Sequence, residues 1–214
     1  MKIQLENVEP MEIEKRSFEI IGQELKEQGK ILQPDTELIV KRCIHTSADF
    51  DYADNLAFSP GAVEQALAAI REGADIVTDT QMAKAGINKR SLARYGGQVH
   101  CFMSDEDVAA AAKAAGTTRA TASMDKAAAL GGNFIYAVGN APTALVRLYE
   151  LIREGKINPK LIIGVPVGFV NVVASKELIM ETEVPWIVAR GRKGGSNIAA
   201  CICNALLYML NNER

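Results

Sequence analysis

"PWIVARGRKGGSNIAACICNALLYMLN", residues 185–211, combines three different patterns in one continuous stretch. It begins with a short apolar run, 185–190, of the kind that is typical of a buried strand. A turn rich in glycine and basic residues follows, and residues 196–211 have the length and apolar content of a helix. The stretch therefore predicts a strand, a turn and a helix in succession, which is the repeating unit of an α/β protein.

The same unit recurs through the chain that precedes this stretch. Short apolar runs predict strands, and the amphipathic segments between them predict helices. For the helix at 60–73 we expect Ser59 to be the N-cap and Pro60 the first helical residue. The other expected helices are 11–29, 34–45, 104–116, 141–155 and 196–211, and the expected strands are 55–59, 74–79, 98–103, 133–139, 160–165 and 185–190.

The alternation of strands and helices predicts the fold class. The strands are nearly unbroken apolar runs, which is typical of a parallel sheet that helices cover on both faces. No linker-like, repeated or low-complexity segment interrupts the pattern. We therefore expect an α/β sandwich with a mainly parallel sheet, formed by a single domain over residues 1–214.

Composition and charge limit the classes of function. The chain has 214 residues, of which 48% are hydrophobic and 23% charged, as in an ordinary soluble globular protein. Its formal net charge of -2 gives no overall positive field, so we expect no nucleic-acid partner. An anionic ligand would instead require arginine and lysine side chains that gather locally.

The sequence also argues against export, membrane insertion and metal binding. The start, "MKIQLENVEP", is charged and contains no apolar signal region. The longest apolar run, 161–174, has 14 residues broken by glycine and proline, whereas a membrane-spanning helix needs about 20. The four cysteines form no C-x-x-C pair. We expect a cytoplasmic, reduced protein without a metal site.

Three strand-to-helix turns are rich in glycine and small polar residues: "GNAPT" (139–143), "PVGFVNVVASKE" (166–177) and "RGRKGGSN" (190–197). In a parallel sheet all three lie at the carboxyl ends of the strands, where ligands bind. Asp79 and Thr80 follow another predicted strand and either belong to the same edge or serve only as caps.

The last of these turns is the most informative. Arg190 and Arg192 precede Gly194, Gly195 and Ser196, and the final helix begins directly afterwards. Free backbone N–H groups at a helix start and forked guanidinium groups both suit carboxylate or phosphate. A solvated basic loop with an ordinary Ser or Asn cap explains the same residues equally well.

Motifs for several common chemistries are absent from the sequence. It contains no phosphate-binding G-x-x-x-x-G-K-[ST] loop, no dinucleotide G-x-G-x-x-G fingerprint and no G-x-S-x-G nucleophile elbow. Two histidines are present, and we expect His100 to point into the sheet core or at a neighbouring side chain. His45 either is a satisfied, partly buried side chain or takes part in proton transfer, and it lies one helical turn after Arg42.

Seven segments spread over nearly the whole chain carry a family resemblance: "KRSFEII" (15–21), "RCIH" (42–45), "FSPGAV" (58–63), "TTRATAS" (117–123), "GNAPTAL" (139–145), "PVGFVNVVASKE" (166–177) and "RGRKGGS" (190–196). In this order they resemble the precorrin-8X methylmutase family of cobalamin biosynthesis. The segment "HTSADFDYAD" (45–54) is more similar to the cobalt-precorrin-8 methylmutases than to the enzymes of the metal-free route.

The resemblance implies a flavodoxin-like α/β sandwich, usually a homodimer. It implies an isomerase that moves a methyl group from C-11 to C-12 of a corrinoid ring without a separate cofactor. The histidine of the family falls on His45, and its substrate-contacting serine and arginine fall on Ser17 and Arg42. The matched turns imply further substrate-binding residues: Arg119, Asn140, Thr143, Arg190, Arg192, Gly194, Gly195 and Ser196.

Three of these residues also have a purely structural explanation. Ser17 could bond to its own helix backbone, Arg42 could pair with a nearby carboxylate, and Arg119 could be a surface residue. The chemistry of the ligand favours the functional interpretation, because a corrinoid polycarboxylate would explain basic turns in a slightly acidic chain. Two alternatives to the isomerase are a corrinoid carrier without catalysis and a flavodoxin-like nucleotide-binding module, the latter disfavoured by the missing phosphate motifs.

Overall fold

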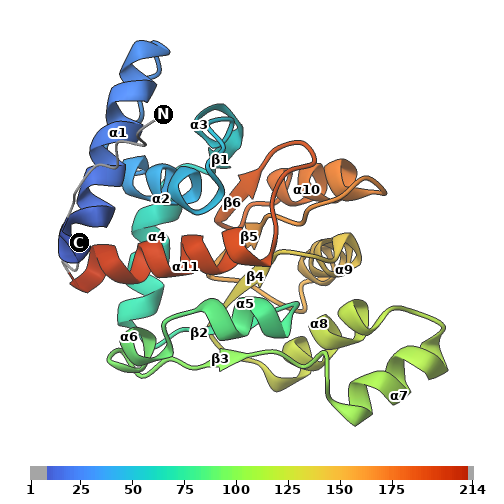
Figure 1. The fold of residues 1–214 in the computed structure, drawn as a ribbon. Helices are drawn as coiled ribbons and strands as arrows, with labels where there is room; N and C mark the ends of the chain where they lie inside the picture. The colour runs from blue at the N-terminus through green and yellow to red at the C-terminus, as the bar shows by residue number, and fades with distance from the viewer. Residues whose placement is uncertain (1–8, 212–214) are drawn as a thin grey trace, which may run out of the picture.

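The computed structural model describes residues 9–211, and a six-stranded sheet lies at its centre (Figure 1). The strands follow one another across the sheet in the order β1-β6-β5-β4-β2-β3. Strands β2 to β6 are parallel, and β1 runs antiparallel to β6 at one edge. The strands are β1 Leu56–Phe58, β2 Asp75–Thr78, β3 Val99–His100, β4 Phe134–Val138, β5 Leu161–Gly164 and β6 Trp186–Ala189.

The five parallel strands have the flavodoxin-like order. Counted along the chain, they stand in the sheet as second, first, third, fourth and fifth. The order reverses between β2 and β4, and ligands of such sheets bind outside the carboxyl ends of the strands at this reversal. The predicted flavodoxin-like, mainly parallel α/β sandwich is therefore confirmed.

Helices cover both faces of the sheet and enclose two hydrophobic cores. Strand β4 shows why, because its residues alternate: Ile135 and Ala137 pack into one core, while Tyr136 and Val138 pack into the other. On the first face lie α1 Ile13–Glu27, α2 Glu37–Ser47, α4 Ala62–Arg71, α5 Gln81–Gly86, α6 Lys89–Ala93 and α11 Ser196–Asn211. On the second face lie α7 Glu106–Ala115, α8 Arg119–Leu130, α9 Pro142–Arg153 and α10 Val172–Met180. Two short pieces, η1 Pro10–Glu12 and α3 Tyr52–Asn55, complete the elements.

The prediction that Ser59 caps a helix is wrong. Helix α4 begins at Ala62 after Gly61, which adopts a left-handed conformation with φ 69°. The backbone of Ser59 continues the pairing with β6, donating from its N–H to the Trp186 carbonyl at 3.0 Å. Its hydroxyl accepts a hydrogen bond from the Trp186 N–H at 2.9 Å. Ser59 therefore extends the edge strand instead of starting the helix.

Several helices fall in segments for which the sequence predicted none or only a turn. Helices α5, α6 and α8 lie in such segments, and α10 occupies the second half of the stretch predicted as the turn 166–177. The strand predicted at 98–103 has only two residues. His100 does contact a neighbour, because its Nε2 lies 2.9 Å from the Asp75 carboxylate.

Two further observations concern the whole described chain. Within residues 9–211, no helix combines the length and the apolar character that crossing a membrane requires. All four cysteines, Cys43, Cys101, Cys201 and Cys203, are free thiols.

Candidate active site

The turn that follows β4 is held by a buried carboxylate. Asp79, just after β2, is fully buried and accepts hydrogen bonds from the backbone N–H groups of Gly139, Asn140 and Ala141 at 2.9, 2.8 and 2.7 Å. Burial raises the pKa of the Asp79 carboxyl above its usual range, and the three N–H donors oppose that rise. Asp79 thus joins β2 and β4 at the reversal of strand order and fixes the start of α9.

The turn that follows β6 lies directly against the turn that follows β4. A Cβ atom on Gly139 would come within 2.7 Å of the Ser196 Cα, so only glycine permits this approach. The Ser196 hydroxyl lies 2.8 Å from that of Thr80, and Thr80 also caps α5. Thr80 is therefore both the N-cap of α5 and part of the carboxyl edge of the sheet, so both interpretations of this residue hold.

Gly194 and Gly195, in the turn after β6, pack against the end of β5. Gly195 donates its backbone N–H to the Val165 carbonyl at 2.8 Å. Gly194 has φ 154°, and a Cβ atom there would overlap the same carbonyl oxygen. The turn is thus tied to β5 below and to the β4 turn at its side.

Polar side chains face solvent along this edge. Asn140, Thr143, Arg190 and Arg192 are exposed, and so is Arg119 at the start of α8. The Thr143 hydroxyl lies 2.9 Å from that of Thr118, the N-cap of α8, so the starts of α8 and α9 adjoin.

An apolar loop lies on the same edge. The Arg192 guanidinium lies 5.2 Å from the ring centroid of Phe169, whose side chain is 80% exposed. Val167 and Val170 in the same loop are also exposed. The edge therefore combines basic groups with an apolar surface, as a large amphiphilic ligand requires.

Salt bridges tie the end of α2 to the turn that follows β6. Lys193 reaches the carboxylates of Asp49 and Asp51, at 2.6 and 2.5 Å. The hydrogen bond from Lys193 lowers the pKa of the Asp49 carboxyl, and both aspartates raise the pKa of the lysine. The segment that carries His45 is thereby attached to the basic turn. Nothing in the local sequence pattern identifies this pairing, because the partners are far apart in the chain.

His45 is exposed at the end of α2 and opens onto a groove. Its ring contacts Phe18 edge-on, with 5.6 Å between ring centroids. The groove has a volume of about 1030 Å³; η1 supplies Met11 to its lining, α1 supplies Ile13 and Phe18, and α2 supplies His45 and Lys41. Met11 is 95% exposed, so the groove is apolar and accessible.

Ser17 and Arg42 lie near this groove but are engaged locally. The Ser17 hydroxyl donates to the Ile13 carbonyl one turn earlier, at 2.8 Å. The Arg42 guanidinium donates to the Glu14 carboxylate at 2.5 Å and lies 4.4 Å from the ring centroid of Tyr208. Its Nε is buried without a hydrogen-bond partner in the described chain. Their roles in substrate binding stay predictions.

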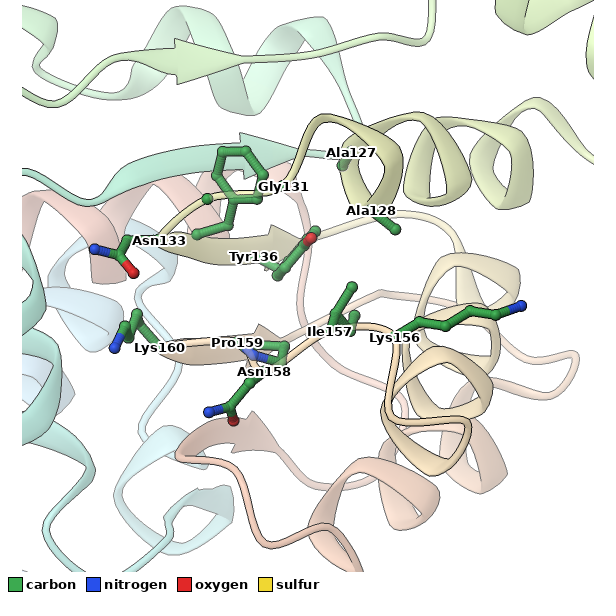
Figure 2. Close-up of a pocket in the computed structure, with 12 residues that line it drawn as sticks. Ala127, Ala128, Gly131, Asn133, Tyr136, Lys156, Ile157, Asn158, Pro159 and Lys160 are labelled. Atoms are coloured by element: carbon green, nitrogen blue, oxygen red, sulfur yellow. The ribbon is translucent and has the colours of Figure 1, made fainter.

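A separate cavity of about 250 Å³ lies at the opposite edge of the sheet (Figure 2). It is located at the amino ends of β4 and β5, where Asn133, Asn158 and Lys160 surround it and Tyr136 points toward it. It shares no residue with the candidate site. Within residues 9–211, no cluster of three or more His, Cys, Asp or Glu side chains is placed to hold a metal ion.

The strand order and the polar carboxyl edge define the class: an α/β protein of flavodoxin-like topology whose candidate ligand surface lies at the reversal of strand order. The family model described as precorrin-8X methylmutase matches residues 12–209. The chain belongs to the precorrin-8X methylmutase family.

Similar proteins cover nearly the whole chain. A cobalt-precorrin-8 methylmutase of Salmonella typhimurium is 47% identical over 94% of this chain and 96% of its own length. One of Priestia megaterium is 43% identical over 96% of this chain and 90% of its own. The crystal structure of a Thermus thermophilus precorrin-8X methylmutase superposes with a TM-score of 0.85 at 40% identity, covering 94% of this chain and 98% of that one.

Proposed function

We propose that this protein is an isomerase that moves a methyl group from C-11 to C-12 of cobalt-precorrin-8 in cobalamin biosynthesis. The cobalt-bearing substrate is favoured by the segment 45–54 and by the names of the Salmonella typhimurium and Priestia megaterium relatives. The reaction is an internal transfer, so it requires no net oxidation or reduction and no separate cofactor.

The substrate carboxylates bind at the carboxyl edge of the sheet in this proposal. Arg190 and Arg192 supply charge-assisted hydrogen bonds, and the exposed backbone of the turn at 191–194 adds N–H donors. The supporting observation is that the hydrogen bond from the Gly195 N–H to the Val165 carbonyl fixes the end of this turn over β5. Donors that are already fixed lose little entropy when a ligand binds. Further contacts come from Arg119, Asn140, Thr143, Gly194 and Ser196. Gly195 is buried and donates its N–H to the Val165 carbonyl, so in this proposal it supports the turn.

His45 is the proposed general acid, which places a proton on the ring as the methyl group migrates. The observation that carries this role is its position: the imidazole is exposed, opens onto a large apolar groove and lies on the segment that Lys193 ties to the basic turn. Ser17 and Arg42 enter the proposal through the family resemblance. Each would have to exchange its present partner for a group of the substrate.

The protein acts in the cytoplasm as a homodimer in this proposal. Met11 of η1 and Ile13 and Ile20 of α1 form an exposed apolar face, which a second copy would cover. A homodimer is also the oligomeric state that the family resemblance implies.

The test is turnover by the purified chain, supplied in parallel with cobalt-precorrin-8 and precorrin-8X. We expect conversion of the cobalt-bearing substrate, followed by its visible spectrum. For His45→Ala we expect single-turnover conversion to fall by about 10²–10⁴-fold, as loss of a general acid usually gives, while corrinoid binding persists. Binding without any turnover by the wild type would favour the corrinoid carrier instead. Full activity of His45→Ala would remove the histidine from the mechanism.

A further inference from the structure

Lys176 on α10 is a buried lysine that binds only backbone carbonyls. Its side chain is 1% exposed, and its Nζ donates to the Gly191 carbonyl at 2.8 Å and to the Lys193 carbonyl at 2.9 Å. In the described part of the chain it forms no ion pair with a carboxylate. Burial lowers the pKa of its ammonium group to about 8. Burying an ammonium group without a counter-ion costs free energy. Among the described residues, the contacts that offset this cost are the two hydrogen bonds from Lys176 to the turn after β6.

The carbonyl between these two is also held, by the loop that precedes α10. The Arg192 carbonyl accepts a hydrogen bond from the Gly168 N–H at 3.1 Å. Three successive carbonyls, those of residues 191, 192 and 193, are therefore directed toward the segment 168–176, which contains both donors. This arrangement needs an unusual backbone, and Gly191 supplies it with φ 74°.

The orientation of the carbonyls determines the orientation of the amides. In a planar trans peptide the C=O and the following N–H point in opposite directions. The N–H groups of Arg192, Lys193 and Gly194 thus point away from the segment 168–176: those of Arg192 and Gly194 point away from Lys176, and that of Lys193 points away from Gly168. None of the three donates a backbone hydrogen bond among residues 9–211. Successive free amides of this kind form a concave anion-binding surface.

We propose that Lys176 is a positioning residue, which holds the turn 191–194 in the conformation that presents three backbone amides to a carboxylate of the substrate. This inference rests on the proposed function and adds to it the group that creates the anion site. The ammonium contributes twice. It fixes the carbonyls by hydrogen bonds, and its positive charge lies behind the amides, on the side opposite the bound anion. The side chain of Arg192 then approaches the same carboxylate from the solvent side.

A purely space-filling role for Lys176 makes a different prediction. Methionine has a similar length and no donor, so Lys176→Met preserves the volume and releases the Gly191 and Lys193 carbonyls. If Lys176 only filled space, this substitution would leave corrinoid binding unchanged. If it positions the turn, corrinoid binding is weakened while the turnover of bound substrate continues.

The experiment compares wild type with Lys176→Met and, as a matched control, Lys113→Met, which removes an exposed lysine on α7. Corrinoid affinity is measured from the visible spectrum, and kcat and KM from turnover. For Lys176→Met we expect KM and Kd to rise at least about 10-fold, the usual scale for loss of charge-assisted contacts. We expect kcat to stay within about threefold of wild type, because binding and not proton transfer has changed. Lys113→Met should behave as wild type.

A double-mutant cycle with Arg192→Ala separates positioning from general destabilisation. In the wild-type background Arg192→Ala should weaken binding about 10-fold, and in the Lys176→Met background by less than about threefold, because the turn is already displaced. If Lys176→Met does not fold, Lys176→Gln, which keeps one N–H donor group, enters the same cycle.

The outcomes distinguish the role of Lys176 from the proposed function. Unchanged corrinoid affinity in Lys176→Met, or strictly additive losses of affinity in the double-mutant cycle, would overturn the positioning role. The proposed function would still stand if the wild type converts the substrate. A wild type that neither binds nor converts either corrinoid overturns the proposed function and the role of Lys176 with it.

Discussion

Replacing Asp79 by alanine should destabilise the fold more than any other single change of a carboxylate at this edge. The side chain is fully buried, and three backbone N–H groups at the start of α9 depend on it. Alanine removes all three acceptors at once. An unpaired buried donor costs about 1–3 kcal/mol. Water can reach the partly exposed Asn140 and Ala141 amides, but the Gly139 amide is buried. We therefore expect a loss of about 3–5 kcal/mol in the free energy of unfolding.

Asparagine at the same position gives a finer test of this geometry. Oδ2 of Asp79 accepts from Asn140 and Ala141, and Oδ1 accepts from Gly139. The amide oxygen of asparagine can replace only one of these two oxygens, so its NH₂ group would face at least one N–H donor. Asp79→Asn should then cost about 1–3 kcal/mol, less than alanine.

Urea denaturation monitored by circular dichroism measures both changes, with Asp75→Asn as the matched control. Asp75 lies at the start of β2, is partly exposed, and accepts from the Gln98 N–H and from His100. Its replacement should cost about 1 kcal/mol or less, because solvent screens the pair. An unfolding free energy for Asp79→Ala within about 1 kcal/mol of wild type, or equal losses for the two sites, would refute the view that Asp79 is the anchor of the edge.

Three other predictions concern the turn after β6 and the assembly. Gly194→Ala places a Cβ against the Val165 carbonyl at a φ of 154°, so we expect a loss of about 2 kcal/mol in stability together with weaker corrinoid binding, and an unaffected variant would contradict this backbone. Lys176 has a pKa of about 8 in the folded chain against an ordinary 10.5, so the unfolded chain binds more protons between these values. Wild-type stability relative to Lys176→Met should therefore rise as pH increases through that window in urea titrations, and a difference that falls or stays flat would contradict the burial of a charged amine. Light scattering should give about twice the chain mass of 23.1 kDa, and a fully active monomer would exclude the proposed dimer.

Much of the sheet could be predicted from sequence because its central strands are buried on both faces. Strands β4, β5 and β6 are continuous apolar runs, and the helices after β4 and β6 have clear starts and apolar stripes. Helix α8 was not predicted because "RATASMDKAAAL" offers small residues instead of large apolar ones at helical spacing. Its buried alanines pack closely only because α7 and α9 are present to meet them.

The site was predictable as a location but not as a set of contacts. Glycine and small polar residues in three successive turns indicated one edge of the sheet, and the structure brings these turns together there. The partners of those turns come from distant parts of the chain: Asp79 precedes its donors by 60 or more residues, and Lys193 reaches back 142 residues to Asp51. Lys176 in "VASKE" has nothing in its local pattern that distinguishes it from a surface lysine. Only the folded chain reveals that it is buried.

The contact between Gly139 and Ser196 has a consequence for anyone who would redesign this protein. The two turns touch backbone to backbone, with no side chain between them to yield. A new loop grafted after β4 must therefore reproduce the path of the loop after β6, and the reverse also holds. Changing ligand preference by exchanging one turn at a time should yield misfolded chains, whereas transplanting both turns together, with Asp79 and Thr80 beneath them, moves an intact unit.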